Sequence, residues 1–88
     1  MQLRSLRRKL GIPIGEAAEG IGIGKATLSR IERREREPTG AVLLLIDLWV
    51  SGLRDQRNLG PEFRIDWTYL IRSLREKRKR NRRRRAAA

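Results

Sequence analysis

The chain has 88 residues, a formal net charge of +12, and neither cysteine nor histidine. A chain this short buries only about 60 % of its unfolded surface, which argues against a deep catalytic cleft, and the missing residue types exclude disulfides, zinc fingers and the commonest general base. We therefore predict no enzyme, no metal and no cofactor, and we predict a polyanion as the partner.

The positive charge is concentrated at the two ends of the chain. Residues 1–38 hold nine Lys or Arg against five acids, residues 39–64 three against three, and residues 65–88 ten against two. The longest apolar run, residues 41–50, is far shorter than the ~20 residues that span a bilayer. The N-terminus also lacks the uninterrupted apolar stretch of a signal peptide. We therefore expect a cytoplasmic protein with nucleic acid, not a membrane, as its partner.

Leucines and glycines mark the first two helices. Leu3, Leu6 and Leu10 recur at helical spacing and predict a first amphipathic helix, which Gly11 can close. The proline two residues later suits the first turn of a second helix. That helix is expected to stop at the glycine-rich residues 20–24, where a tight turn is predicted.

A third helix is predicted over residues 25–34. Leu28 and Ile31 face inward, while polar and basic side chains share the opposite face. Pro38 ends the loop that follows. This helix therefore offers a basic surface to solvent.

Residues 42–50 form an apolar run that predicts a fourth helix. Because the run is apolar on nearly all sides, we expect the core to bury it, with a partner chain as a further cover. Ser51 and Gly52 are expected to end this helix. From Leu53 to Arg64 the pattern is irregular, and Gly60-Pro61 marks a break in it.

The apolar signal returns after residue 65. Asp66 can cap a fifth helix. The apolar stripe of that helix is formed by Trp67, Leu70, Ile71 and Leu74. Phe63, Ile65 and Trp67 also alternate, so a short strand before or in place of the helix start stays open. The aromatic residues of this region, together with Trp49, are interpreted as core or dimer contacts and not as platforms for stacking bases.

The end of the chain is a basic tail, residues 77–88, predicted to be disordered without a polyanion. Its eight positive residues are Lys77, Arg78, Lys79, Arg80, Arg82, Arg83, Arg84 and Arg85. We interpret the tail as a source of nonspecific DNA affinity, and insertion into a minor groove, RNA binding and solubility remain alternatives. Residues 51–76 are predicted to be a linker and a C-terminal helix with a role in dimerisation.

The sequence IGEAAEGIGIGKATLSRIER, residues 14–33, resembles the helix-turn-helix of the Cro and phage-repressor family, also called the xenobiotic-response-element (XRE) family. The matching positions are Ala18 as the small helix contact, Gly22 as the turn glycine, Ile23 as the apolar plug, and Leu28 and Ile31 as the buried face. Residues 6–12 and 31–39 resemble the family's flanks. The resemblance implies an all-α, lambda-repressor-like DNA-binding domain of four to five helices, with its core in residues 1–50.

The resemblance also implies one ion pair, between Arg7 of the first helix and Glu32 after the buried isoleucine. The sequence departs from the family pattern elsewhere. Pro13 and Ile14 stand where a capping Ser or Thr and a phosphate-binding Gln are usual, and Gly24 replaces another cap. Arg34 replaces the glycine that ends the third helix, so either this helix continues or the loop bends differently.

Four groove-facing residues are carried over from the family as base contacts. They are Lys25, Ala26, Ser29 and Arg30. Arg30 can satisfy guanine O6 and N7 together, Lys25 can reach the same acceptors, and Ala26 suits a thymine methyl. The predicted contacts to the DNA backbone are Arg8, Lys9, Arg33, Arg34, Arg36 and Gly24, which exposes the amides that follow it.

We therefore expect a transcriptional regulator of the Cro or repressor kind, bound to double-stranded DNA in the nucleoid of a bacterial or phage-infected cell. One short helix reads only a few base pairs, so a homodimer with recognition helices about 34 Å apart on a pseudo-palindromic operator is predicted. The fourth helix and residues 59–74 are the expected interface. Two alternatives stay open: an antitoxin-like autoregulator that binds a partner protein through residues 51–88, and an architectural or recombination-directionality factor.

Overall fold

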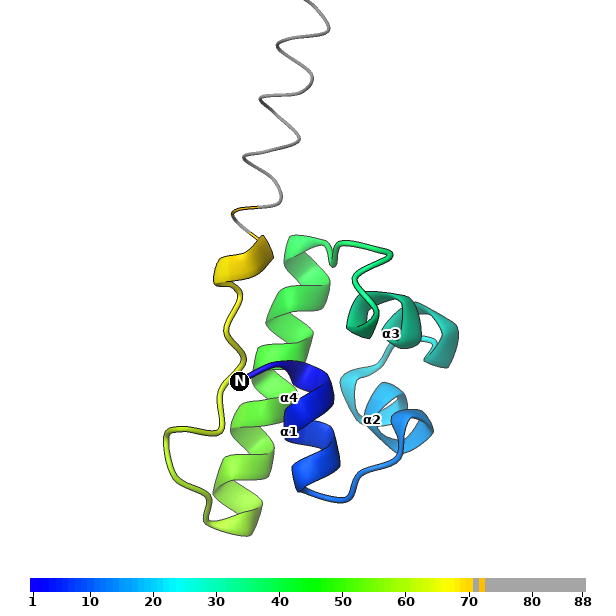
Figure 1. Ribbon diagram of the computed structural model, residues 1–88. Helices are drawn as coiled ribbons and strands as arrows, with labels where there is room; N and C mark the ends of the chain where they lie inside the picture. Colours follow the sequence, from blue (N-terminus) through cyan, green and yellow to red (C-terminus); the bar gives the residue numbers. More distant parts are fainter. Residues whose placement is uncertain (71, 73–88) are drawn as a thin grey trace, which may run out of the picture.

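The computed structural model describes residues 1–70 and residue 72, and these residues form an all-α domain (Figure 1). Its helices are α1 (Leu3–Lys9), α2 (Ile14–Ile21), α3 (Lys25–Glu32) and α4 (Gly40–Arg57). A short helical turn follows at residues 68–70, and the described part of the chain contains no strand. The prediction of an all-α domain is confirmed, and the basic tail lies outside the described residues.

Glycines end the first two helices as the sequence indicates, with one shift. Gly11 follows α1 in the left-handed region, at a φ of 68°. Helix α2 runs through Gly20 to Ile21, and Gly22, with a φ of 92°, is its C-cap. A left-handed backbone at these positions costs glycine nothing, because glycine has no Cβ.

Helix α3 ends two residues earlier than predicted, at Glu32 instead of Arg34. Arg34 itself takes the left-handed conformation, with a φ of 61°. The arginine therefore adopts the backbone that a helix-ending glycine would adopt, although L-residues with a Cβ are strained there. Of the two alternatives for Arg34, the second is observed: α3 ends before this residue, and the loop bends there.

Helix α4 is longer than predicted: it starts at Gly40 and continues through Ser51 and Gly52 to Arg57. The expectation that Ser51 and Gly52 end it was wrong. An internal glycine costs about 1 kcal/mol in a helix, but one more turn brings Leu53 into the core beside Ile46 and Val50, and burying a leucine contributes about 1.5–3 kcal/mol. Residues 51–57 are thus part of α4 and not of a linker.

The ends of α4 have clear caps. Thr39 accepts a hydrogen bond at its Oγ1 from the Val42 N–H, at 3.3 Å. Asn58 ends the helix in the left-handed conformation, with a φ of 54°, which asparagine tolerates better than most residues.

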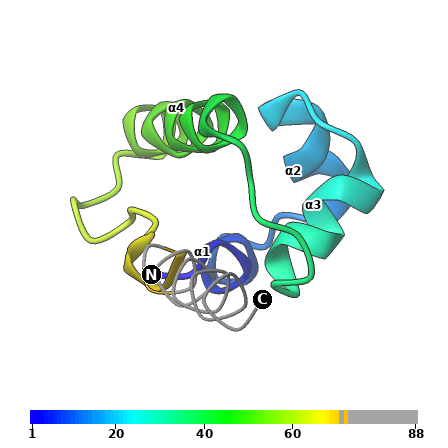
Figure 2. The same cartoon turned by 90° about the horizontal axis from the view of Figure 1, so that it is seen from above.

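Viewed from above, the four helices surround one core, with α4 opposite α1 and α3 and with α2 beside α4 (Figure 2). Residues 59–67 return along α4 to the start of the chain (Figure 1). Arg54 of α4 holds this return segment through a hydrogen bond from Nη1 to the Phe63 carbonyl, at 2.8 Å. The Asp66 N–H donates to the Met1 carbonyl at 3.0 Å. The return segment therefore completes the core of the same chain.

The alternation of Phe63, Ile65 and Trp67 reflects packing and not strand pairing. Ile65 is buried, and the two aromatic rings are partly buried against the core. Asp66 caps the helical turn, because its Oδ1 accepts from the Thr68 N–H at 2.9 Å. The capping prediction is confirmed, whereas the predicted apolar residues Ile71 and Leu74 lie outside the described residues.

One face of α4 is not covered by the other described residues. Leu44 is 61 % exposed, Leu48 60 % and Leu45 40 %. We call these three residues the leucine face. The described part of the core therefore leaves this face of α4 exposed, and its cover by a partner chain stays a prediction.

Candidate DNA interface

The helix-turn-helix is built by the packing of α2 against α3. Ala17 and Ala18 are buried and small, so the two helices approach closely across the turn at Gly22. Ile23 packs partly buried against the core, and Leu28 and Ile31 of α3 are buried. The positions selected from the resemblance therefore occupy the expected places.

A second close approach fixes α2 against α4. A Cβ built on Gly20 would lie 2.5 Å from Nε1 of Trp49 and 2.9 Å from its Cδ1. The indole thus occupies the space that a side chain at position 20 would need. The sequence pattern had indicated a turn at this glycine, and its role in packing against Trp49 was missed.

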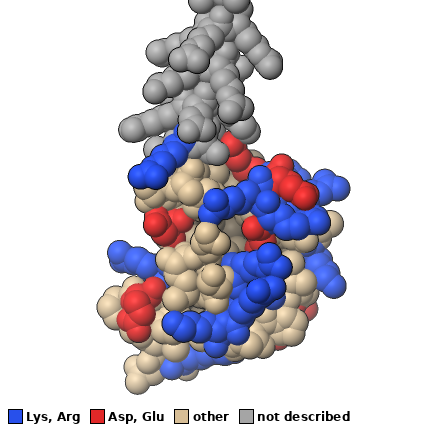
Figure 3. All heavy atoms as spheres, viewed as in Figure 1, with Lys and Arg blue, Asp and Glu red and all other residues tan. Residues whose placement is uncertain are grey.

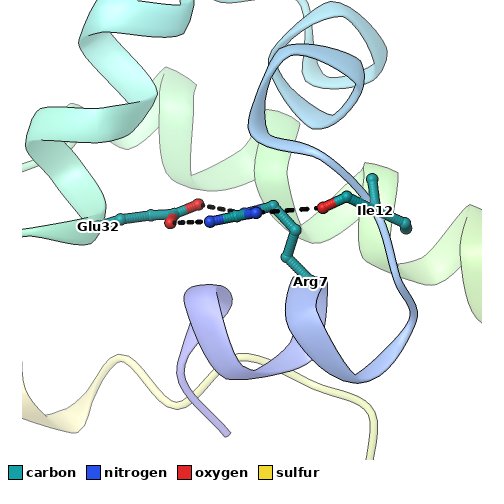
Figure 4. Close-up of polar contacts among 3 residues, drawn as sticks. All are labelled: Arg7, Ile12 and Glu32. Atoms are coloured by element: carbon teal, nitrogen blue, oxygen red, sulfur yellow. Dashed lines mark hydrogen bonds and ion pairs between the residues drawn. The ribbon is translucent and has the colours of Figure 1, made fainter.

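The predicted pair between Arg7 and Glu32 is present and joins α1 to α3 (Figure 4). Nη2 of Arg7 lies 2.8 Å from Oε1 of Glu32, and Nε lies 3.0 Å from Oε2. Nη1 donates to the Ile12 carbonyl at 3.1 Å. The side chains are only 14 % and 3 % exposed, and the hydrogen bonds that Arg7 donates to Glu32 raise the pKa of Arg7. This bidentate pair fixes the end of α3 relative to α1 and the loop before α2.

The outer face of α3 carries the residues predicted to read bases. Lys25, Ala26 and Arg30 are exposed, and Ser29 is half-buried. Gly24 precedes the helix in an extended conformation, and among the described residues no side chain caps the first turn. The first amides of α3 therefore stay available to an anion, at the positive end of the helix dipole.

Helix α2 offers less to a ligand at its start. Its N-cap is Pro13, without a side-chain cap in the described part of the chain, and Ile14 packs partly buried against the core. The family's usual phosphate-binding glutamine is thus replaced by a packing residue. Among the described residues, the start of α3 and the residues after this helix thus offer more to an anion than the start of α2 does.

Residues 33–39, the α3–α4 loop, form a second basic region. Arg33, Arg34 and Arg36 are all exposed. Arg33 pairs with Glu35 at 3.4 Å, and both side chains are 55 % exposed, so the pair is weak. The guanidinium carbon of Arg34 lies 4.3 Å from the centroid of the Tyr69 ring, a cation–π geometry. This last contact joins the loop to the helical turn at residues 68–70, and sequence reasoning missed it.

Helix α1 adds further positive charge on a neighbouring face. Arg4, Arg8 and Lys9 are exposed, and Lys9 Nζ lies 5.8 Å from the centroid of Phe63. In the space-filling view, Lys and Arg side chains gather over α1 and around the α3–α4 loop, with acidic groups between and beside them (Figure 3). The basic surface therefore extends beyond α3.

The described residues bring together no group of acids that could hold a metal ion. Within the same residues, no helix is long and apolar enough to cross a membrane.

The family model described as Helix-turn-helix matches residues 3–47. The chain therefore belongs to the helix-turn-helix family of the XRE type. It is a DNA-binding regulator of that type, from a family of DNA-binding regulators and not of enzymes. No curated protein and no solved structure matches the chain.

Proposed function

We propose that this regulator acts as a Cro-like or repressor-like protein that reads a pseudo-palindromic operator with α3 and excludes polymerase or a competing repressor from promoter DNA. The observation that carries the proposal is the exposed face of α3. Lys25, Ala26 and Arg30 lie on it, and the buried pair of Arg7 with Glu32 holds the helix from behind. A recognition helix must be rigid to read base edges, and this support provides rigidity.

The base contacts have distinct roles in the proposal. Arg30 donates two hydrogen bonds to O6 and N7 of a guanine, a contact worth about 1–3 kcal/mol of discrimination. Lys25 reaches the same kind of acceptor with less directional preference. Ala26 contacts a thymine methyl, and Ser29 donates to an acceptor on a neighbouring base.

The backbone contacts surround this set. The amides that follow Gly24 bind one phosphate, and Arg33, Arg34 and Arg36 contact phosphates along the loop. Arg8 and Lys9 of α1 add weaker contacts. These interactions position the domain on the duplex and carry no sequence information, so they govern affinity and its salt dependence.

Dimerisation is the third part of the proposal, and the leucine face supports it. Ile65 and Leu70, from the predicted interface of residues 59–74, are buried in their own chain, whereas Leu44 and Leu48 are not. Residues 39–64 hold equal numbers of basic and acidic residues, so two copies of a chain with net charge +12 repel each other least at α4. We therefore assign the interface to the leucine face.

The test is selection of bound genomic fragments by the purified protein, by Arg30→Ala and by Arg36→Ala as the matched control. Arg30→Ala is expected to degenerate the recovered palindrome at one position in each half-site, at a cost of about 1–3 kcal/mol on the parent site. Arg36→Ala is expected to weaken all sites alike and to lower the salt slope by about 1. Recovery of no motif by the intact protein would contradict operator reading.

Dimerisation is tested separately by sedimentation of the parent protein and of Leu48→Glu, with Asp55→Glu as a control on the same exposed side of α4. We expect Leu48→Glu to be monomeric and to retain its helical circular dichroism, because Leu48 makes little contact with its own core. A parent protein that sediments as a monomer at the concentration that saturates the operator would contradict the assignment.

A further inference from the structure

Helix α4 contains a glycine that contacts within one protomer do not explain. Gly52 lies inside the helix, where glycine is unfavourable because it loses more backbone entropy on folding than other residues do. A Cβ built on Gly52 would meet no atom within 4 Å, so the described residues leave room for a side chain there. Gly20, by contrast, has no such room, because the indole of Trp49 fills it. The missing side chain at position 52 therefore points to a contact outside the described protomer.

Gly52 lies on the same side of α4 as the leucine face. Leu44 and Gly52 stand about one helical turn before and one turn after Leu48, so the three residues share one side of the helix. Ser51, like Gly52, is half-buried. This side of α4 thus carries exposed leucines in its first half and small residues in its second half. Leu48 itself stands in the middle of α4 (Gly40–Arg57).

A helix with this pattern is complementary to a second copy of itself that runs in the opposite direction. In a two-fold symmetric pair centred on Leu48, Leu44 of one protomer lies opposite Gly52 of the partner, and Leu45 lies opposite Ser51 of the partner. Each bulky residue meets a small one, so the two helices approach closely without a clash. Pairing in the same direction would instead place leucine against leucine and leave the two glycines facing each other.

The charges of α4 also favour the antiparallel pair. Residues 40–53 contain one charged residue, Asp47, and its Oδ1 accepts a hydrogen bond from Trp67 of the same chain. Arg54 and Arg57, near the end of the helix, donate to carbonyls of their own chain. In the antiparallel pair, the positive start of each α4 lies beside the negative end of the partner helix. A pair in the same direction would bring like ends together.

The antiparallel pair also keeps both copies of α3 on one side of the dimer. Helices α2 and α3 lie on one lateral side of α4 in both views, and no described element covers the upper side of α4 in Figure 2 (Figures 1 and 2). The two-fold axis of an antiparallel pair is perpendicular to the helices and to the line that joins them. It therefore points to the side of α2 and α3, and rotation about it keeps the second α3 there. An axis parallel to α4 would put the two copies of α3 on opposite sides.

We propose that two copies of the protein pair through antiparallel α4 helices, with Leu48 at the two-fold axis and with Leu44 of each copy in the space above Gly52 of the other. This inference rests on the dimerisation part of the proposed function and adds the direction and the register of the pair. The pair buries the leucine face of both chains. It also presents both α3 helices to one side of a single duplex.

The first test is disulfide crosslinking, since the chain has no cysteine of its own. A disulfide forms only where two Cα atoms come within about 7 Å. Leu48→Cys is expected to crosslink with itself under mild oxidation. Leu44→Cys and Gly52→Cys are each expected to stay largely uncrosslinked alone and to form a linked heterodimer when they are mixed. Glu62→Cys, at an exposed position of the return segment, is the control for random collision and is expected to stay unlinked.

Substitution of Gly52 tests the fit between large and small residues. Gly52→Leu is expected to weaken the dimer by about tenfold or more in sedimentation, because Leu44 of the partner loses its space. The folded protomer is expected to be at least as stable as the parent, because its own chain has room at position 52 and helix propensity improves. The double variant Leu44→Ala with Gly52→Leu exchanges the large and the small residue, and it is expected to bind itself more tightly than Gly52→Leu does. Circular dichroism checks that each variant stays helical.

The outcomes separate this inference from the proposed function. Self-crosslinking of Leu48→Cys, together with the linked heterodimer of Leu44→Cys and Gly52→Cys, would support the antiparallel register. A dimeric parent protein in which Leu44→Cys links to itself as fully as Leu48→Cys, or in which no cysteine variant links, would overturn the inference and leave dimerisation standing. An unchanged dimer in Gly52→Leu would overturn it as well. A monomeric parent protein would overturn both the inference and the proposed dimer, whereas base reading by α3 is decided by the fragment selection.

Discussion

The buried pair of Arg7 with Glu32 allows a quantitative prediction of stability. In Glu32→Gln the side-chain shape is nearly unchanged, but the guanidinium of Arg7, which is only 14 % exposed, loses its counter-charge. Removing one partner of a buried pair costs about 3–5 kcal/mol, because the remaining charge stays buried and uncompensated. An exposed pair would cost less than about 1 kcal/mol. With exposed fractions of 14 % and 3 %, the first range applies.

The size of this loss must be compared with the stability of the whole domain. At about 0.05–0.15 kcal/mol per residue, some seventy described residues give a free energy of unfolding of about 4–10 kcal/mol. Glu32→Gln is therefore expected to remove a large share of it. In a domain of this size each kcal/mol lowers Tm by about 4–8 °C, so the expected fall in Tm is at least about 12 °C.

The assay is urea unfolding followed by circular dichroism for the parent protein, Glu32→Gln, Arg7→Met and the double variant Arg7→Met with Glu32→Leu. The double variant is expected to be more stable than either single variant, because an apolar pair leaves no buried charge. Single variants that each lose less than about 1 kcal/mol, or losses that add in the double variant, would refute this reasoning.

Three further predictions concern backbone conformation, packing and pH. Gly20→Ala is expected to destabilise the domain in a denaturant titration. Overpacking against Trp49 costs about 1–3 kcal/mol, which exceeds the gain of about 1 kcal/mol in helix propensity. In a Trp49→Leu background, where the indole is absent, the same substitution should stabilise the domain. Asn58→Ala should cost about 1 kcal/mol in the same assay and Asn58→Gly almost nothing, since position 58 has a φ of 54°. Burial raises the folded pKa of Tyr69 above its ordinary value of 10.0, so its contribution to stability is present below pH 10 and is lost as pH rises through the raised pKa. Unfolding at pH 9–11 should therefore show a loss in the parent protein that Tyr69→Phe lacks.

Much of the first half of the fold could be predicted, because local spacing determines it. Gly11 and Gly22 lie where a left-handed residue is needed, and Leu28 and Ile31 lie on one face of a short helix. The length of α4 was not predictable in the same way. Gly52 indicates a helix end when it is judged by propensity, and only the burial of Leu53 against residues of other helices reverses that judgement.

The candidate site shows the same division between local and long-range information. The exposure of Lys25 and Arg30 follows from the amphipathic pattern of α3. The pair of Arg7 with Glu32 was predicted from the resemblance, since neither residue alone indicates its partner. The contact between Arg34 and Tyr69 joins positions that no periodicity relates, so no sequence signal could have identified it.

The hydrogen bond from the Asp66 N–H to the Met1 carbonyl has a consequence for how the chain folds. It joins the two ends of the described fold, and contacts of such long separation form slowly because loop closure costs entropy. The turn between α2 and α3 needs only neighbours, so it is expected to form early, with residues 59–70 docking last. The last segment to dock is also the first to open in native-state hydrogen exchange. The helix-turn-helix is therefore expected to be assembled before residues 59–70 close the domain against α4 and the start of the chain.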